Sequence, residues 1–403
     1  MIIDNQAHLS YCTNIHAGET WEEIFNSLKQ YTLNVKNHIA PNTPFGIGLR
    51  LSQISTKTLL ADDNLLHFKT WLDSNQLYVF TVNGFPYGSF HDTIIKDQVH
   101  TPDWTTDERI SYTKDLMKIL SYLLPEHIDG SVSTSPLSYK HWFKNEEHAN
   151  NAKQKTCESL IEIVLQLIDI KKTSGKLLHL DLEPEPDGFL ENTKEVIDFY
   201  TNYLFKNGVN IIENKLACTP AQAKKHIQDH LQICYDVCHF ALAYEKPEFV
   251  ITSLQNEGIK IGKVQISAAI QCKKSGSVSI KEQQSCLRQF DEPTYLHQSV
   301  IKLNDDSLVH FSDLAEGITY MNHANFKEIR THFHVPIFVS KFQVLESTQN
   351  DIIDALNLWK SKKYSDHLEV ETYTWSILPE YLQTDITSSI TRELNWVVDQ
   401  LSK

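Results

Sequence analysis

Short strand-like runs alternate with amphipathic helical patterns along most of the chain, and this alternation is the strongest constraint on its fold. In "TTDERISYTKDLMKILSYLLP" (105–125), for example, apolar residues recur at intervals of three and four, as on one face of a helix. Strand-like runs of this series lie at 8–15, 45–52, 77–84, 128–135, 176–186, 232–240, 261–267 and 367–375. Parallel neighbouring strands need crossover helices, so eight such units predict an α/β TIM (β/α)8 barrel. A doubly wound open sheet is the alternative, and the lack of a glycine-rich phosphate loop after any run disfavours it.

The regular alternation lapses before the last run. We expect one barrel domain over residues 1–403 with a long insertion at about 270–328, followed by an extra strand-like segment at 330–338. Long irregular segments in compact domains are usually functional lids or disordered. The insertion is therefore a candidate for substrate selection.

Two helix ends carry clear local signals. Thr20 and Glu23 have the spacing of a capping box at a helix start. The helix after the fifth run is expected to end at Gly208, because glycine is the usual residue just beyond a helix C-terminus.

Composition excludes several classes of partner. The net charge is −14 and the Lys/Arg doublets are not extended, which argues against nucleic acid as a partner. No stretch approaches the roughly 20 apolar residues of a membrane span, so we expect no membrane insertion. Seven cysteines without a CxxC pair indicate reduced thiols. With no basic and apolar leader at the start, these features predict a cytoplasmic protein.

In a TIM barrel, functional residues come from the C-terminal ends of the strands and the loops that follow them. The polar residues at those positions are His16, Asn83, Ser133, Glu183, Asp236 with His239, Gln265, His332 with His334, and Glu371.

The acidic residues among them have specific requirements. Glu183 lies at the mouth end of its strand, on the same face as Asp181. Glu371 lies within a β-branched and aromatic run, where a buried carboxylate needs a cation or a proton. Asp236 and His239 are either a metal-ligand pair or a helix cap followed by an unrelated histidine.

The remaining candidates are also open to two interpretations. His332 and His334 share one strand face and can bind one metal ion, although a lone HxH pair is a weak signal. Gln265 suits hydrogen bonding as well as coordination. Taken together, oxygen and imidazole ligands on successive strand ends suit Zn²⁺ or Mn²⁺, and also Mg²⁺ or Co²⁺.

The order Glu, Asp-x-x-His, Gln, His-x-His, Glu resembles that of the xylose isomerase-like TIM barrels. These are sugar and sugar-phosphate isomerases and epimerases, with endonuclease IV as a cousin. The resemblance implies a divalent metal ion that stabilises an enediolate, with glutamates on opposite sides of the substrate moving the proton.

When the family's site residues are matched to this sequence by position, the resemblance implies a role for each candidate. Glu183 and Glu371 match two glutamates that ligate the metal and are catalytic, and Asp236 matches a ligating aspartate. His332 and His334 fall where the cousin has Asp-x-His, and Gln265 falls where a ligating histidine is expected. His16, Asn83 and His239 would contact the substrate.

More specifically, the chain resembles the EboE family, the xylose isomerase-like members of the Ebo metabolite-traffic gene cluster. The stretches that carry this include "YCTNIHAGETWEEIF", "LYVFTVNGFPYGSFH", "LDLEPEPDG", "YDVCHFA", "THFHVPIF" and "LEVETYTWSILP". The resemblance implies a role in processing or export of a secondary metabolite precursor, with other Ebo cluster proteins as partners.

Three functions follow as hypotheses. The first is a metal-dependent isomerase or epimerase of a small sugar- or polyol-like metabolite. The second is a metal-dependent phosphoester hydrolase related to endonuclease IV. The third is a non-catalytic metabolite-binding protein with a degenerate metal site, which Gln265 at a ligand position supports.

Overall fold

A nine-stranded sheet forms the body of the protein. The computed structural model describes residues 1–403 apart from 5–6, 89–95, 376–377 and 381–382. Eight of the strands run parallel in the order β2-β15-β8-β7-β6-β5-β4-β3, and β1 adds to β2 in the antiparallel sense. The strands are β1 (Ile2–Ile3), β2 (Ala7–Tyr11), β3 (Phe45–Arg50), β4 (Leu77–Asn83), β5 (Gly130–Thr134), β6 (Leu178–Leu182), β7 (Leu231–Asp236), β8 (Ile261–Ile266) and β15 (His367–Val370). The predicted TIM barrel is confirmed.

The barrel closes between β2 and β3 mainly through a side chain. An isolated parallel bridge joins Cys12 to Gly48. Beside it, the Ser10 hydroxyl donates to the Gly46 carbonyl at 2.7 Å and accepts from the Gly48 amide at 3.1 Å. The Ser10 side chain thus replaces part of the backbone hydrogen bonding between β2 and β3.

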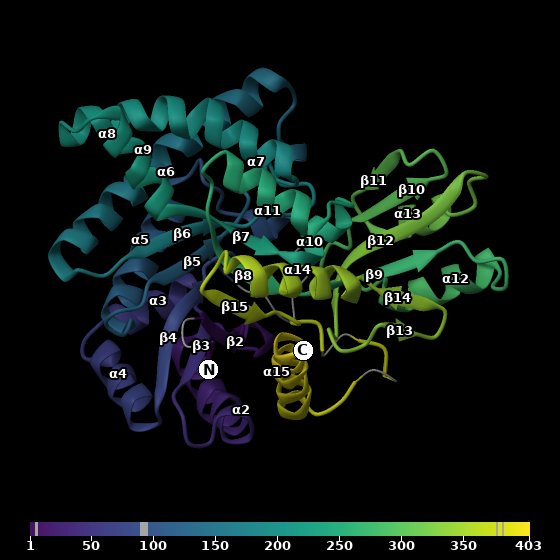
Figure 1. Ribbon diagram of the computed structural model, residues 1–403, viewed down its shortest axis with the longest axis horizontal. Helices are drawn as coiled ribbons and strands as arrows, with labels where there is room; N and C mark the ends of the chain where they lie inside the picture. The colour runs from purple at the N-terminus through teal and green to yellow at the C-terminus, as the bar shows by residue number, and fades with distance from the viewer. Residues whose placement is uncertain (5–6, 89–95, 376–377, 381–382) are drawn as a thin grey trace.

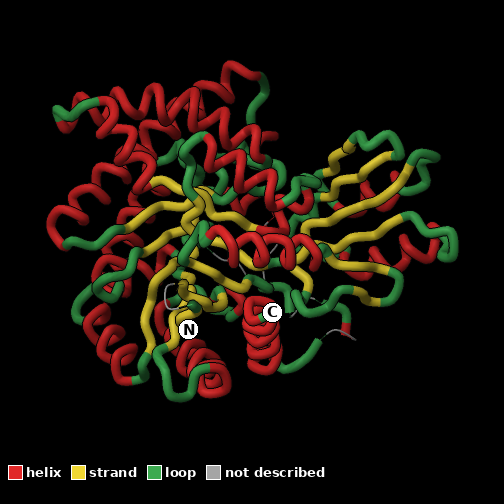
Figure 2. Tube along the Cα trace, in the orientation of Figure 1, coloured by secondary structure: helices red, strands yellow, loops and turns green. Residues whose placement is uncertain are grey.

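Helices surround the barrel (Figures 1 and 2). They are α1 (Trp21–Ser27), α2 (Leu33–Ile39), α3 (Gln53–Leu60), α4 (Asn64–Ser74), α5 (Asp107–Leu123), α6 (Glu146–Ser174), α7 (Thr193–Phe199), α8 (Val209–Leu216), α9 (Pro220–His230), α10 (Val237–Leu242), α11 (Pro247–Asn256), α14 (Gln349–Lys362) and α15 (Ile386–Ser402). Among the described residues, no helix combines the length and the apolar character that crossing a bilayer requires.

The chain between β8 and β15 builds a second, antiparallel sheet in the order β11-β10-β12-β9-β14-β13. Only Ser267 separates β8 from β9, so the chain passes directly from the barrel into this sheet, which extends beyond the interval 270–328 on both sides. It stands beside the barrel at the right of Figure 1. Its elements are β9 (Ala268–Lys273), α12 (Ile280–Leu287), β10 (Ser299–Leu303), β11 (Leu308–Phe311), α13 (Leu314–Tyr320), β12 (Phe326–Val335), β13 (Lys341–Phe342) and β14 (Leu345–Ser347).

Local signals predicted some helix ends and missed others. The capping box of Thr20 and Glu23 is confirmed. The expected helix end at Gly208 is wrong, because the helical segment continues through α8 to Leu216. A Cβ on Gly208 would lie 2.9 Å from Ile161 Cδ1, so this glycine allows close packing against α6. The run 232–240 is also not all strand, since β7 ends at Asp236 and α10 begins at Val237.

An ion pair lies inside the barrel. Lys263 of β8 and Glu369 of β15 are fully buried, and Lys263 Nζ donates to Glu369 Oε2 at 2.6 Å. Lys263 Nζ also donates to Ser133 Oγ at 3.0 Å. A Cβ on Gly48 would lie 1.6 Å from Glu369 Oε1, so only glycine at position 48 leaves room for this carboxylate.

We predict that Lys263→Met lowers the free energy of unfolding by about 3–5 kcal/mol, because it leaves a buried carboxylate without its cation. Urea unfolding monitored by circular dichroism measures the change. The double variant Lys263→Met/Glu369→Leu should recover most of the loss, since it removes both charges. A double variant no more stable than the single one would contradict this account.

Helix α15 carries a second buried carboxylate. Glu393 Oε1 accepts from Thr372 Oγ1 at 2.7 Å and from the Ile337 amide at 3.2 Å. It thereby fixes the segment that follows β15 and the segment that follows β12. Burial raises the pKa of Glu393 to about 8 from an ordinary value of 4.5.

The folded protein therefore holds the Glu393 proton more tightly than the unfolded chain does. We predict that this residue's stabilising contribution, complete below pH about 4.5, falls as the pH rises toward 8, by at most about 1.4 kcal/mol per pH unit. Glu393→Gln keeps the acceptor oxygen and should flatten the pH dependence of urea unfolding between pH 5 and 8. Glu248→Gln, at an exposed position, should leave it unchanged.

Candidate metal centre

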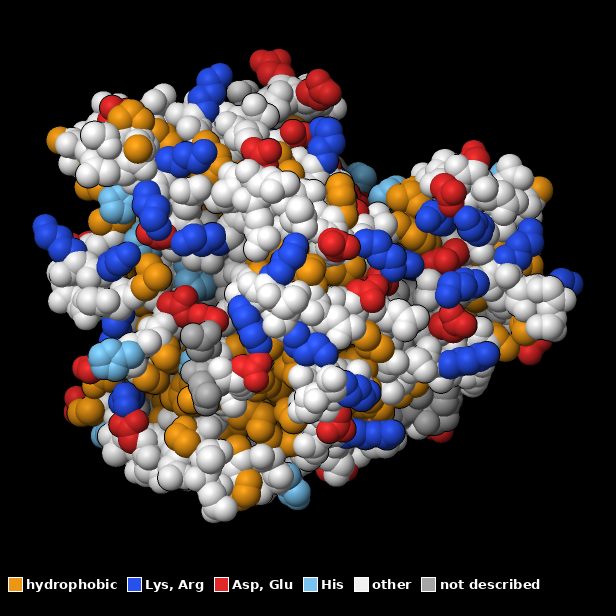
Figure 3. Space-filling model, viewed as in Figure 1, with side chains coloured by type: hydrophobic (Ala, Val, Ile, Leu, Met, Phe, Trp, Pro, Cys, Tyr) orange, Lys and Arg blue, Asp and Glu red, His pale blue; other side chains and the backbone are white. Residues whose placement is uncertain are grey.

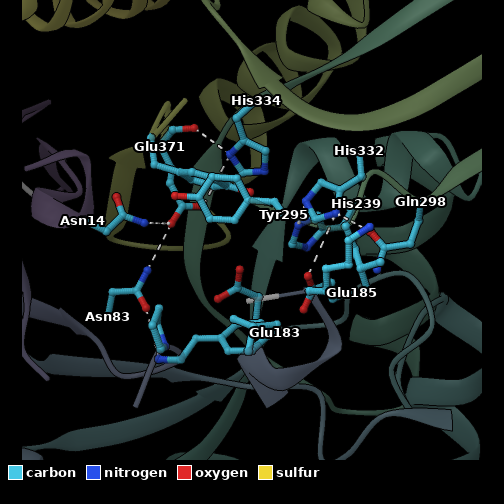
Figure 4. Close-up of a pocket in the computed structure, with 16 residues that line it drawn as sticks. Asn14, Asn83, Glu183, Glu185, His239, Tyr295, Gln298, His332, His334 and Glu371 are labelled. Atoms are coloured by element: carbon cyan, nitrogen blue, oxygen red, sulfur yellow. Dashed lines mark hydrogen bonds and ion pairs between the residues drawn. The ribbon is translucent and has the colours of Figure 1, made fainter. Parts of the chain in front are cut away.

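A cavity opens at the C-terminal ends of the barrel strands, between the barrel and the inserted sheet. It contains about 580 Å³ of empty space, including its open mouth. Barrel segments supply Asn14, Asn83, Phe85, Pro86, Lys96, Val99, Glu183, Glu185, His239, Glu371 and Tyr373, and the inserted segment supplies Tyr295, Leu296, Gln298, His332 and His334. The inserted sheet therefore forms one wall of the cavity (Figure 4).

Three acidic side chains from separate strand ends converge at the cavity floor. Glu183 follows β6, Asp236 ends β7 and Glu371 follows β15, and one carboxylate oxygen of each lies within 4.8 Å of the others. All three residues are buried. Within the described part of the chain, Glu183 Oε2 and Asp236 Oδ2 have no hydrogen-bond partner.

Asp236 proves to be both a helix cap and a member of this group. Its Oδ1 accepts from the His239 amide at 3.2 Å, which caps α10, and from Ser267 Oγ at 2.6 Å. These two bonds fix Oδ1, whereas Oδ2 makes no hydrogen bond among the described residues. Oδ2 lies 4.0 Å from His334 Nε2 and 4.0 Å from His239 Nε2.

A bulge in the inserted sheet brings in two histidines. β12 pairs with β9 through Thr331 opposite Ile270, and next through Val335 opposite Ala268. Residues 332–334 therefore face a single residue of β9, and this irregularity re-aims their side chains, as bulges beside functional sites often do. His334 Nδ1 is 2.8 Å from the Glu371 carbonyl, which leaves Nε2 facing the carboxylates.

A second group of potential ligands adjoins the first. Glu185, His239 and His332 each place a ligand atom within 4.8 Å of the others. His239 Nε2 is 3.1 Å from His332 Nε2, and the opposite nitrogens are held by the Pro184 carbonyl at 2.8 Å and by Gln298 Oε1 at 2.9 Å. Figure 4 shows this group on one side of Glu183, with Glu371 and Asn83 on the other.

Burial sets the protonation of these groups. Burial, followed by repulsion from neighbouring carboxylates, raises the pKa values of Glu183 and Glu371 well above their usual range. Burial lowers the pKa of His334 to about 4 and that of His332 well below its usual value. The cavity thus combines two glutamates that resist losing their protons, Glu183 and Glu371, with two histidines that stay neutral, His332 and His334.

The donor set fits a divalent cation. Glu183, Asp236, Glu371 and His334 would hold it. Three of them present atoms without a hydrogen bond among the described residues, and Asp236 lies close both to the two glutamates and to His334. Carboxylate oxygens with one or more imidazoles suit Mn²⁺, Zn²⁺, Co²⁺ or Mg²⁺. A cation would also relieve the mutual repulsion of the buried carboxylates.

The structure gathers most of the predicted site residues but not all. Asn83 lies in the cavity, and its amide donates to Glu371 Oε1 at 3.0 Å. Gln265 is buried on β8, where its Oε1 accepts from the Cys234 thiol at 2.9 Å. His16 is not brought to the cavity. It stacks on Tyr31 and contacts the Tyr11 hydroxyl at 3.0 Å, beside a separate small pocket.

Sequence reasoning missed several residues of the cavity. Asn14 lies on a short 3-10 turn after β2, and its amide donates to Glu371 Oε1 at 2.8 Å. Tyr295 and Gln298 come from the inserted segment, where no periodic pattern indicates which side chains face the barrel. The sequence does offer a reason to consider Asn14 as a cavity residue. It lies two residues before His16, on the same connection between a strand and a helix.

Comparison with solved structures identifies the class of fold. No family model and no curated protein matches the sequence. The chain is similar to a xylose isomerase-like TIM barrel protein from Mycobacterium smegmatis in complex with magnesium, with 10% identity, coverage of 100% of this chain and 99% of that chain, and a TM-score of 0.51.

Two further similar structures have lower scores. An IolI protein with a bound zinc atom has 12% identity, covers 98% of each chain and gives a TM-score of 0.47. The 3-keto-D-glucoside 4-epimerase YcjR from E. coli has 10% identity, covers 98% of this chain and 100% of that chain, and gives 0.43. The match at a TM-score of 0.51 shows that the protein has the TIM-barrel fold of xylose isomerase-like proteins.

We predict that Glu371→Gln weakens Mn²⁺ binding on the order of 100-fold, because it removes a ligand charge and keeps the shape. Electron paramagnetic resonance of free Mn²⁺ during a titration measures the affinity. Glu248→Gln makes the same charge change at an exposed position and should bind as the wild type does. Equal Mn²⁺ affinity in Glu371→Gln and the wild type would contradict the assignment.

Proposed function

We propose that the protein is a metal-dependent isomerase or epimerase that moves a proton between carbon atoms of a sugar- or polyol-like metabolite. The observation that carries this proposal is the convergence of Glu183, Asp236 and Glu371 within 4.8 Å at the mouth of the barrel. Two carboxylates at the floor of the same cavity can act as proton acceptor and proton donor for one substrate carbon.

The arrangement of each glutamate supports a separate role. Asn14 and Asn83 both donate to Glu371 Oε1, which fixes its orientation and places Oε2 3.7 Å from His334 Nδ1. Glu183 lines the cavity, and the carboxylate oxygen that it does not offer to the ion would accept the proton. Its raised pKa lets it hold that proton near neutral pH before returning it.

A divalent ion, when bound, supplies Lewis acidity that stabilises negative charge on substrate oxygens. The xylose isomerase-like barrel of similar fold was determined with magnesium, which is consistent with an ion of this kind here. Tyr295, Tyr373 and Phe85 line the cavity with aromatic surface and would exclude water from the reacting carbon. His239 and Gln298 would contact substrate hydroxyls.

The wider role rests on the resemblance to the EboE family. We propose that the substrate is a precursor of a secondary metabolite and that other Ebo cluster proteins are partners. A cytoplasmic location is supported by seven free cysteines. Acidic and basic side chains are interspersed over the face in Figure 3, which with a net charge of −14 disfavours nucleic acid as a partner.

Deuterium incorporation from D₂O tests the proposal. With a panel of ketoses and cyclic hydroxy ketones, Mn²⁺-loaded protein should introduce label at the carbon next to the carbonyl. Glu183→Gln and Glu371→Gln should lose at least 100-fold of this rate, because each removes one proton-transfer group. Glu248→Gln should retain it. Mass spectrometry of the recovered substrates measures the label.

A phosphoester hydrolase is the second candidate, favoured by the group of Glu185, His239 and His332 beside the first. Two adjacent ions can stabilise both the attacking and the leaving oxygen of a phosphoester. Cleavage of p-nitrophenyl phosphate without deuterium exchange, together with loss of one bound ion in Glu185→Gln, would favour this candidate over the isomerase. Absence of both reactions, together with no stoichiometric bound ion, would favour a metabolite-binding protein with a degenerate metal site.

A further inference from the structure

A second group of ligand-type side chains lies at the opposite end of the barrel. His179 is near the start of β6, His367 begins β15, and Asp129 directly precedes β5. These three residues place one ligand atom each within 4.8 Å of one another. They come from the N-terminal ends of strands, whereas the candidate metal centre lies at the C-terminal ends.

The two imidazoles face one carboxylate. His367 Nε2 is 3.2 Å from Asp129 Oδ1, and His179 Nε2 is 3.6 Å from Asp129 Oδ2. The imidazole rings are buried, with side-chain exposures of 1% each. His367 Nε2 is buried and faces the Asp129 carboxylate, so this nitrogen points at the space that the three residues share.

The outer nitrogens of both rings are held in place. His179 Nδ1 is 2.6 Å from Asp181 Oδ1, and His367 Nδ1 is 2.9 Å from Ser131 Oγ. Metal-binding histidines commonly have this arrangement, in which a carboxylate or hydroxyl orients the ring and leaves the inner nitrogen for the ion. Asp181 fits only because position 262 is glycine, where a Cβ would lie 2.2 Å from Asp181 Oδ1.

Solvent can reach the group. Asp129 has a side-chain exposure of 33% and lines an open hollow with about 1580 Å³ of empty space, solvent included, together with His8 and Asp366. An ion can therefore enter from this hollow, and water from it can complete the coordination. The protein ligands themselves come from elements far apart in sequence.

We propose that Asp129, His179 and His367 form a structural site for a zinc-type divalent ion at the N-terminal end of the barrel. Two imidazole nitrogens and one carboxylate oxygen are a donor set that Zn²⁺ prefers. The ion would tie β5, β6 and β15 together, and this end of a TIM barrel usually serves stability rather than chemistry. The site is independent of the proposed function, with which it shares no residue.

Zinc stoichiometry tests this site. Chelator-stripped protein is dialysed against Zn²⁺ and its metal content is measured by mass spectrometry. His367→Gln should bind one equivalent less than the wild type, and so should Asp129→Asn, whose side chain is partly exposed and less critical for folding. His127→Gln removes a histidine of the same hollow, with a side-chain exposure of 92%, and should bind as the wild type does.

Two further results separate this site from the candidate metal centre. Glu371→Gln should leave the loss caused by His367→Gln unchanged, so that the two losses add in the double variant. Crystals of the wild type soaked in Zn²⁺ should give an anomalous peak among Asp129, His179 and His367. Absence of that peak with equal zinc content in His367→Gln and the wild type would overturn the proposal and leave the group as an ion-pair network.

Discussion

The ammonium group of Lys263 is the positive charge around which the barrel interior is arranged. It is fully buried, pairs with Glu369 at 2.6 Å, and lies below the carboxylates of the candidate metal centre. Its charge lowers the pKa values of Glu183 and Glu371, but burial and the mutual repulsion of the carboxylates outweigh it. Lys263 is therefore matched by Glu369, and the acidic groups above this pair have to be neutralised by protons or by a further cation.

Strand periodicity predicted the part of the site that depends on the barrel alone. Glu183, Asp236 and Glu371 each lie at or just after the C-terminal end of a parallel strand, and such ends meet at one face of a closed sheet. Any chain with these strands would bring these positions together. The choice between helix cap and metal ligand for Asp236 could not be made from sequence, because Oδ1 caps the helix while Oδ2 faces the histidines and carboxylates of the candidate centre.

The rest of the site depends on irregular structure. His16 was expected at the mouth, yet a short 3-10 turn after β2 directs Asn14 there and sends His16 toward Tyr31. His332 and His334 reach the barrel only because a bulge interrupts the pairing of β12 with β9. Neither the turn nor the bulge has a periodic signature, so their effects on side-chain direction appear only in three dimensions.

Gly48 lies at the junction of β2 with β3 and also next to Glu369 of the buried ion pair. Its missing side chain leaves the space that Glu369 fills, and its amide bonds to Ser10 at the point where β2 meets β3. A larger residue there would displace the carboxylate that neutralises Lys263. During evolution these positions are therefore not free to change one at a time. Relatives that replace Gly48 are expected to have lost the acid at position 369 as well. Relatives that keep both residues are expected to keep the buried ion pair at the centre of the barrel.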